Sequence, residues 1–268
     1  MTQDILVPAS VSATSRRLGY PEMGAGGFSH VDGTIQFYSR INALLAPDHT
    51  VVDLGAGRGA FLEDTVAYRR ELRRLQGKVR RVIGLDVDPA VLANPSLDEA
   101  HVLEPNGGFP LADASVDLML SDFTFEHIES PEHVAAEIGR VLRPGGWLCA
   151  RTPNKRGYIA LGARVVPNQL HKAALRRLQP SKQERDTFPT RYRMNAVADL
   201  RRLFPEESYD HFTYAADNEP AYAGSSAAAW RLADGILHRA PRPYRSMLYI
   251  FIQRRLGPPE ATRPGGVS

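Results

Sequence analysis

The sequence predicts an α/β protein with a doubly wound, mostly parallel sheet, and three neighbouring features support this fold class. Residues 50–54 read Thr-Val-Val-Asp-Leu, a short apolar run typical of a buried strand. Gly55, Gly57 and Gly59 follow at every second position and allow a tight turn that a ligand can approach closely. A helix pattern comes next, over residues 59–76. Strand, glycine turn and helix form the first unit of a nucleotide-binding α/β domain.

Apolar patterns along the rest of the chain predict further strands and helices in alternation. The helix at 59–76 has one apolar face, made by Phe61, Thr65, Tyr68, Leu72 and Leu75. The other expected helices lie at 31–46, 89–94, 131–142 and 195–204, and Pro144-Gly145-Gly146 separates the third of these from the strand after it. The other expected strands lie at 81–86, 100–103, 116–121, 146–151, 208–214 and 247–252.

Length and composition fit one compact enzyme domain. A chain of 268 residues buries a sizeable core, and its 43% hydrophobic and 24% charged residues are ordinary for a globular protein. The single cysteine, Cys149, excludes an internal disulfide, lies in an expected buried strand and is interpreted as a packing residue. No apolar run is long enough to cross a bilayer and no signal peptide is evident, so we expect a cytoplasmic protein.

Two acids at strand ends restrict the ligand of the glycine turn. The spacing of the glycines also fits the dinucleotide form GxGxxA, which would indicate a nicotinamide or flavin enzyme. Asp53, however, stands directly before the turn, where it would repel a pyrophosphate and attract a cation. Asp86 ends the next strand, where a carboxylate can accept both ribose hydroxyls. S-adenosylmethionine satisfies both acids, because it has a cationic amino acid end, a ribose and no phosphate.

Four motifs in order resemble those of class I S-adenosylmethionine-dependent methyltransferases, the group that includes the ubiquinone-type and sugar-type enzymes. They are VVDLGAGRG at 51–59, VIGLDVDP at 82–89, FPLADASVDLMLSDFTFEHI at 109–128 and EIGRVLRPGGWL at 137–148. The resemblance covers about 100 residues and implies a Rossmann-like, seven-stranded sheet whose last strand is antiparallel.

The resemblance also implies roles for residues in the cofactor site. Those expected at the methionine end are Asp53, Gly55, Gly57 and Gly59, with Ser121 to Phe123 at the sulfur. Asp86 would bind the ribose and Val87 would lie against the adenine. For the adenine amino group two residues stay open, Glu104 and Asn106, and of these Asn106 is our prediction.

The predicted organisation is a single methyltransferase domain at 1–256 with three additions and a tail. Residues 1–46 would cover the cofactor, 155–193 form a basic insertion on the substrate side, and 215–245 form a second insertion. The proline- and glycine-rich segment 257–268 is expected to be a disordered tail.

The insertion at 155–193 is strongly charged. Ten basic residues against two acidic ones give it a net charge of +8, so the rest of the chain carries −5 of the overall +3. This predicts either a solvated helix face or a platform for an anionic small molecule, such as a sugar or glycan intermediate. Peripheral contact with a membrane surface stays open, nucleic acid is not expected because no RNA-binding motif is present, and the oligomeric state is not predicted.

Candidate residues for the chemistry lie near the carboxyl ends of the strands. His127 follows the fourth strand and has a side chain suited to a general base, although a structural role is an equal alternative. His30 and His171 are weaker candidates. Asn154 is expected to orient the acceptor, and Arg191 and Arg193 are expected to provide two fixed cations for it. No cluster has metal-ligand spacing, so no metal is predicted.

Three functions follow from these patterns. The first is an active methyltransferase that methylates an oxygen of a small polar or anionic acceptor, with His127 as the base for the hydroxyl proton. The second is a catalytically silent methyltransferase fold that binds a ligand or partner. The third is a nicotinamide-dependent oxidoreductase. The intact pair of Asp53 and Asp86 favours the first.

Overall fold

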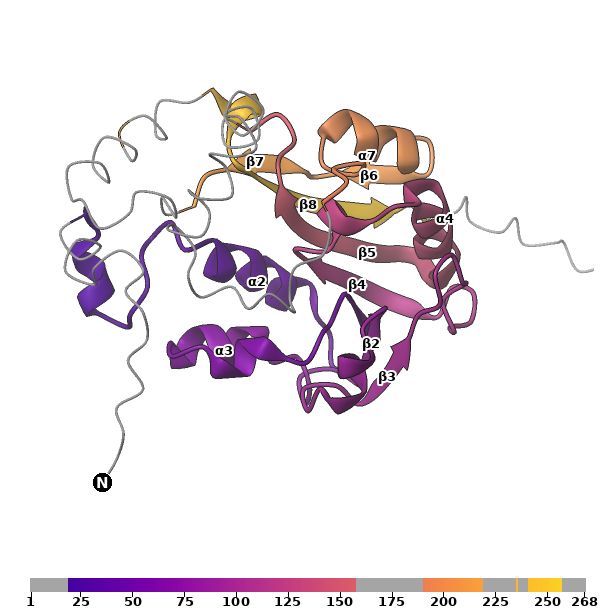
Figure 1. Ribbon diagram of the computed structural model, residues 1–268, viewed down its shortest axis with the longest axis horizontal. Helices are drawn as coiled ribbons and strands as arrows, with labels where there is room; N and C mark the ends of the chain where they lie inside the picture. The colour runs from indigo at the N-terminus through magenta and orange to yellow at the C-terminus, as the bar shows by residue number, and fades with distance from the viewer. Residues whose placement is uncertain (1–18, 158–189, 219–234, 236–240, 257–268) are drawn as a thin grey trace, which may run out of the picture.

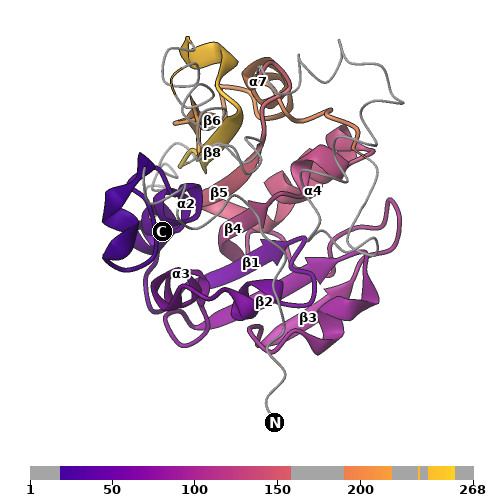
Figure 2. The ribbon, with the colours of Figure 1, turned by 60° about the vertical axis from the view of Figure 1, so that its left-hand side comes forward.

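A single mixed sheet forms the centre of the protein. The computed structural model describes residues 19–157, 190–218, 235 and 241–256. In this part of the chain eight strands form the sheet in the order β3-β2-β1-β4-β5-β8-β6, with β7 also paired to β8 (Figure 2). The strands are β1 (Thr50–Leu54), β2 (Arg81–Asp86), β3 (Glu99–Val102), β4 (Val116–Asp122), β5 (Leu142–Pro153), β6 (Tyr209–His211), β7 (Tyr214–Ala216) and β8 (Met247–Arg254).

The directions of the strands confirm the predicted fold class. β1 pairs in parallel with β2 and β4, and the parallel pairing continues outward to β3 and β5. The last strand, β8, runs antiparallel to β5, β6 and β7. The carboxyl ends of β1, β2, β4 and β5 therefore meet at one edge of the sheet, where ligands bind in folds of this kind.

Helices cover both faces of the sheet (Figure 1). Alternate residues of β1 show why: Val51 packs in a cluster with Phe37 on one face, whereas Val52 packs in a cluster with Ile138 on the other. The first face carries α2 (Gly33–Leu44) and α3 (Ala67–Arg73), and the second carries α4 (Pro131–Val141) and α7 (Val197–Leu203). Short 3-10 turns are η1 (Pro21–Gly24), η2 (Ala60–Glu63), η3 (Pro89–Ala93), η4 (Phe125–His127) and η6 (Arg242–Tyr244).

The prediction of one continuous helix at 59–76 is wrong. The structure has η2 and α3 instead, separated by an extended backbone at Asp64. The carboxylate of Asp64 accepts a 2.9 Å hydrogen bond from the N–H of Val66 and holds the guanidinium of Arg69 at 2.7 Å. These local side-chain hydrogen bonds compete with the backbone hydrogen bonds of a helix, and the expected helix is divided in two. As a result Tyr68 is 51% exposed rather than buried on a shared face.

Two other expectations need correction. The strand expected at 208–214 is two short strands, β6 and β7, which pair with successive parts of β8. The Pro-Gly-Gly at 144–146 lies inside β5, and the positive φ of Gly145 (81°) accompanies an irregular register between β4 and β5. The remaining helices and strands begin and end within a few residues of the predicted positions.

Parts of the predicted organisation lie outside the described residues. These are the first 18 residues of the N-terminal cover, most of the basic insertion at 155–193, much of the second insertion at 215–245, and the tail at 257–268. The division into a single domain with these additions stays a prediction.

Candidate active site

The glycine turn after β1 is built on three left-handed residues. Gly55, Gly57 and Gly59 have φ angles of 84°, 50° and 76°, which glycine adopts without strain. A Cβ at Gly55 would meet Thr124 Oγ1 at 1.9 Å, and one at Gly59 would meet Asn94 Oδ1 at 2.5 Å. At Gly57 nothing lies within 4 Å. The two ends of the turn are thus packed against protein, and its middle faces open space.

Asp86 connects this turn to the end of β2. Its Oδ2 accepts a 2.8 Å hydrogen bond from the N–H of Gly57, and its Oδ1 accepts one of 2.9 Å from the N–H of Asp88. The half-buried carboxylate also lines a cleft of about 790 Å³ at the carboxyl edge of the sheet, a size that suits a cofactor. Each oxygen has a second lone pair for a ribose hydroxyl.

The cleft brings together most of the predicted cofactor residues. Those that line it are Gly55, Gly57, Asp86, Val87 and Asn106, and the candidate base His127 lines it as well. Val87 is 55% exposed, which leaves its side chain available to an adenine ring. Glu104 also lines the cleft, so the geometry keeps both candidates for the adenine amino group. Asn106 is held in place because its Oδ1 accepts a 2.8 Å hydrogen bond from Ser130.

Two predicted cofactor residues have a structural place instead. Ser121 is fully buried and donates a 3.0 Å hydrogen bond from its hydroxyl to the carbonyl oxygen of Leu54, which ties β4 to β1. The residues after it, Asp122 to Thr124, line the cleft in its stead. Gly59 packs against Asn94 and is absent from the residues that line the cleft. Side chains alternate between the two faces along β4, and the side chain of Ser121 points to a face that is buried in the protein. This is why Ser121 does not line the cleft.

Asp53 lies on the other side of the glycine turn, in a second cavity of about 230 Å³. Tyr38 and Arg73 line this cavity with it, and Gly55 and Gly57 line both cavities. Burial raises the pKa of Asp53 to about 7, and the neighbouring charge of Asp122 adds to the effect. A cation beside it would restore the ionised form.

A buried ion pair beside Asp53 was missed in the sequence. Arg151, at the end of β5, donates two hydrogen bonds of 2.8 Å to the carboxylate of Asp122, at the end of β4. Burial alone would raise the pKa of Asp122, but the charge and hydrogen bonds of Arg151, together with the charge of Arg73 and the hydroxyl of Tyr38, outweigh it and the pKa is lowered. The hydroxyl of Tyr38 and the guanidinium of Arg73 approach the same carboxylate at 3.2 and 3.4 Å. The signal in the sequence that could have predicted this pair was the presence of opposite charges at the ends of two adjacent parallel strands.

The candidate base, His127, lies in η4 on the wall of the cleft. Its side chain is 25% exposed and its Nε2 is 3.9 Å from Oε1 of Glu126. Glu126 is buried and accepts a 2.8 Å hydrogen bond from Thr152. Burial raises the pKa of Glu126. The imidazole is therefore exposed to the cleft and backed by an acid that the core holds in place.

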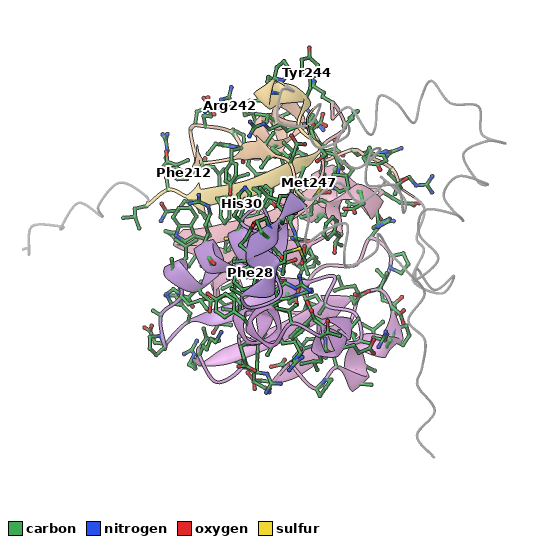
Figure 3. All side chains as sticks on the ribbon, turned by 90° about the vertical axis from the view of Figure 1, so that its left-hand side faces the viewer. Phe28, His30, Phe212, Arg242, Tyr244 and Met247 are labelled. Atoms are coloured by element: carbon green, nitrogen blue, oxygen red, sulfur yellow. The ribbon has the colours of Figure 1, made fainter. Side chains whose placement is uncertain are left out.

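Of the two weaker candidate histidines, only His30 belongs to the part of the chain that the structure describes, and it does not line the cleft. His30 lies on the N-terminal segment (Figure 3), where its Nδ1 is 2.8 Å from the carboxylate of Glu22. His171 lies outside the described residues. Cys149 is buried in the core, and burial raises the pKa of its thiol, as expected of a packing residue.

On the acceptor side, the structure separates Asn154 from the two arginines. Asn154 is buried, and its amide group donates to the carbonyl oxygens of Pro243 and Arg245 at 3.0 and 2.8 Å. It ties two chain segments together, so the expectation that it orients an acceptor is wrong. Arg191 and Arg193 both contact Glu129 on the rim of the cleft, the first through its carboxylate and the second through its carbonyl oxygen.

The described residues also limit two other kinds of site. Within them, no group of three or more histidine, cysteine, aspartate or glutamate side chains could hold a metal ion. Among the same residues, no helix is both long and apolar enough to span a bilayer.

Comparison with known proteins identifies the family of this domain. Residues 52–150 match the family model described as "Methyltransferase domain". A Mycolicibacterium smegmatis protein named "Probable S-adenosylmethionine-dependent methyltransferase" is 40% identical over 41% of this chain and 52% of its own length. Malonyl-[acyl-carrier protein] O-methyltransferase of Methylococcus capsulatus is 30% identical over 62% of this chain and 60% of its own length. The chain thus spans between half and two thirds of these two relatives.

A solved structure supports the fold. Geranyl diphosphate C-methyltransferase of Streptomyces coelicolor, at 15% identity, superposes with a TM-score of 0.51 over 82% of this chain and 76% of its own. The sequence motifs, the family model and the strand order agree. Residues 52–150 thus match a methyltransferase domain, and the chain is similar to S-adenosylmethionine-dependent methyltransferases in sequence and in fold.

Proposed function

We propose that this protein is an active S-adenosylmethionine-dependent methyltransferase that O-methylates a small polar or anionic acceptor, such as a sugar or glycan intermediate. One observation carries the proposal: a single cleft is lined both by Asp86, bound to the glycine turn, and by His127. The cofactor elements and a candidate base therefore face the same space.

The residues fit the cofactor. The open space at Gly57 is where a Cβ would project, so the backbone there can be approached closely by a ligand. Asp86 can accept from the ribose, and Val87 with Asn106 or Glu104 can contact the adenine. The acids Asp86, Asp88 and Glu104 give the cleft negative charge that suits a cationic ligand.

Bound S-adenosylmethionine supplies a methyl group on a positively charged sulfur, which an acceptor attacks in line. The protein's part is to hold the two reactants together and to accept the proton of a hydroxyl acceptor. His127 would accept that proton, with Glu126 behind it. Arg191 and Arg193, on the rim, would provide positive charge for an anionic acceptor, together with the basic insertion.

The test is activity on a panel of sugar phosphates, glycans, quinone precursors and short RNAs. We expect methylation in the first two groups. His127→Ala should lower turnover by about 10²- to 10⁴-fold, the usual contribution of a general base, while the affinity for S-adenosylhomocysteine stays unchanged. Methylation of quinone precursors or RNA alone would overturn the acceptor class, and full turnover by His127→Ala across pH would overturn the base.

Calorimetry separates the alternative functions. Binding of S-adenosylhomocysteine but not of NAD would exclude the oxidoreductase, because Asp53 and Asp122 stand where a pyrophosphate would be repelled. Binding of the cofactor without turnover on any acceptor would favour the silent binding protein.

A further inference from the structure

The glycine turn after β1 is supported by a side chain from another loop. Asn94 follows η3, and its amide nitrogen donates hydrogen bonds of 3.1 and 3.0 Å to the carbonyl oxygens of Ala56 and Gly57. These partners lie 38 and 37 positions earlier in the chain. Asn94 is buried, and it lines neither the large cleft nor the small cavity beside the turn. It therefore touches the turn from outside the space that a ligand can occupy.

The residues that follow Asn94 fix the orientation of its amide. Pro95 disfavours a helical backbone at the residue before it, so η3 ends at Ala93 and Asn94 has an extended backbone with a ψ angle of 108°. Its Oδ1 accepts hydrogen bonds of 3.0 and 2.6 Å from the N–H and the hydroxyl of Ser96. An amide has two donors and two acceptor sites, and here all four are used. The nitrogen must face the turn, because the oxygen faces Ser96.

Gly57, in the middle of the turn, is bound on both sides by different elements. Its N–H donates to Asp86 at the end of β2, and its carbonyl oxygen accepts from Asn94. A Cβ at Gly59 would meet Asn94 Oδ1 at 2.5 Å, so the end of the turn packs against the same side chain. Glycine backbones have many accessible conformations. The hydrogen bonds from Asp86 and Asn94 therefore restrict the turn to one of them.

We propose that Asn94 is a positioning residue for the cofactor, which holds the glycine turn in the conformation that binds S-adenosylmethionine. This inference rests on the proposed function, because it requires that the chain binds S-adenosylmethionine. A protein that has the binding conformation for only a fraction of the time binds its ligand more weakly by that fraction. Asn94 acts through the backbone of Ala56 and Gly57, whereas Asp86 supports the turn and lines the cleft as well.

Asn154 provides a matched control, because it makes the same hydrogen bonds away from the turn. It is buried, and its amide nitrogen donates to two backbone carbonyl oxygens at 3.0 and 2.8 Å. Its Oδ1 accepts a 3.0 Å hydrogen bond from the N–H of Arg156, two positions further on, as Asn94 does from Ser96. Aspartate in either position keeps the shape and the acceptor oxygen but removes both donated hydrogen bonds. We expect Asn94→Asp and Asn154→Asp to lower the melting temperature to a similar extent.

Calorimetry with S-adenosylhomocysteine and hydrogen exchange of the free protein test the assignment. For Asn94→Asp we expect an affinity roughly 10- to 100-fold lower, as the loss of two hydrogen bonds would give, and faster exchange in peptides that cover residues 55–59. For Asn154→Asp we expect an affinity within about twofold of the wild type and unchanged exchange in those peptides. Asn94→Ala and Asn154→Ala repeat the comparison without a buried charge, and they serve if the aspartate variants do not fold.

Three results would overturn the inference alone. They are unchanged affinity in a folded Asn94 variant, an equal loss of affinity in the corresponding Asn154 variant, and a loss of affinity without faster exchange in the turn. Failure of the wild type to bind S-adenosylhomocysteine would overturn the proposed function, and this inference with it.

Discussion

The carboxylate of Asp86 accepts a 2.8 Å hydrogen bond from the N–H of Gly57, so the end of β2 fixes the middle of the turn that follows β1. The two residues are 29 positions apart, and the parallel register of β1 and β2 brings them together. One side chain thus shapes the turn and faces the cleft at the same time.

Asp86→Ala should weaken binding of S-adenosylhomocysteine by roughly 10- to 150-fold. The reason is that a charge-assisted hydrogen bond contributes about 1.5–3 kcal/mol, and the turn loses its support as well. Calorimetry measures the affinity, and Asp98→Ala serves as a control because Asp98 caps the start of β2 instead. Unchanged affinity in a folded Asp86→Ala variant would remove the ribose assignment.

The glycines of the turn should respond differently to a side chain. Gly57→Val should reduce cofactor affinity strongly while lowering the free energy of unfolding by only about 1–2 kcal/mol, the strain of a left-handed residue. Gly55→Val should destabilise the fold far more, since its Cβ meets Thr124. Thermal melts and calorimetry on both variants check this, and normal binding by Gly57→Val would mean that the turn does not touch the ligand.

Stability should depend on pH through Asp53. Its pKa is about 7 in the folded protein and near 3.8, the ordinary value of an aspartate, in the unfolded chain. The contribution of this group to the free energy of unfolding is therefore fully present below the unfolded pKa and is lost as pH rises through the folded one. Asp53→Asn should flatten the profile over that interval. Urea titrations across the range measure it, and identical slopes for both proteins would contradict the shift.

Breaking the buried pair of Arg151 and Asp122 should be costly. Their side chains are 4% and 8% exposed, so Arg151→Met leaves a buried carboxylate without its partner and should lower the free energy of unfolding by about 3–5 kcal/mol. Adding Asp122→Asn should recover part of the loss. Chemical denaturation is the measurement. Arg201→Met, in an exposed pair with Glu206, should change stability by less than about 1 kcal/mol.

Local patterns explain which features could be predicted from the sequence. The buried strands and the glycine turn follow from apolar runs and residue spacing, so β1, β2, β4 and β8 were predicted nearly in full. The break before α3 was not, because Arg69 binds Asp64 and also reaches Asp32, 37 positions away. Tertiary contacts of this kind override an apolar periodicity.

The site shows the same limit. Asp86 and Gly57 belong to motifs with a fixed place in the fold, whereas the pairing of Arg151 with Asp122 depends on the register of β4 and β5. The position of Asn154 at the end of β5 suggested that its side chain could bind an acceptor. Its amide group instead donates hydrogen bonds to the carbonyl oxygens of Pro243 and Arg245. A polar residue at a strand end has a functional or a structural role according to contacts that lie far along the chain.

The position of β8 has a consequence for how the chain folds during synthesis. β8 lies between β5 and β6 and is the last of the described strands to be made, and Phe251 pairs with Cys149 across about a hundred positions. Until it emerges from the ribosome, β5 has an open edge with unpaired N–H and C=O groups, which is a template for aggregation. The nascent chain is most vulnerable in that interval, and its yield should depend on how quickly β8 arrives.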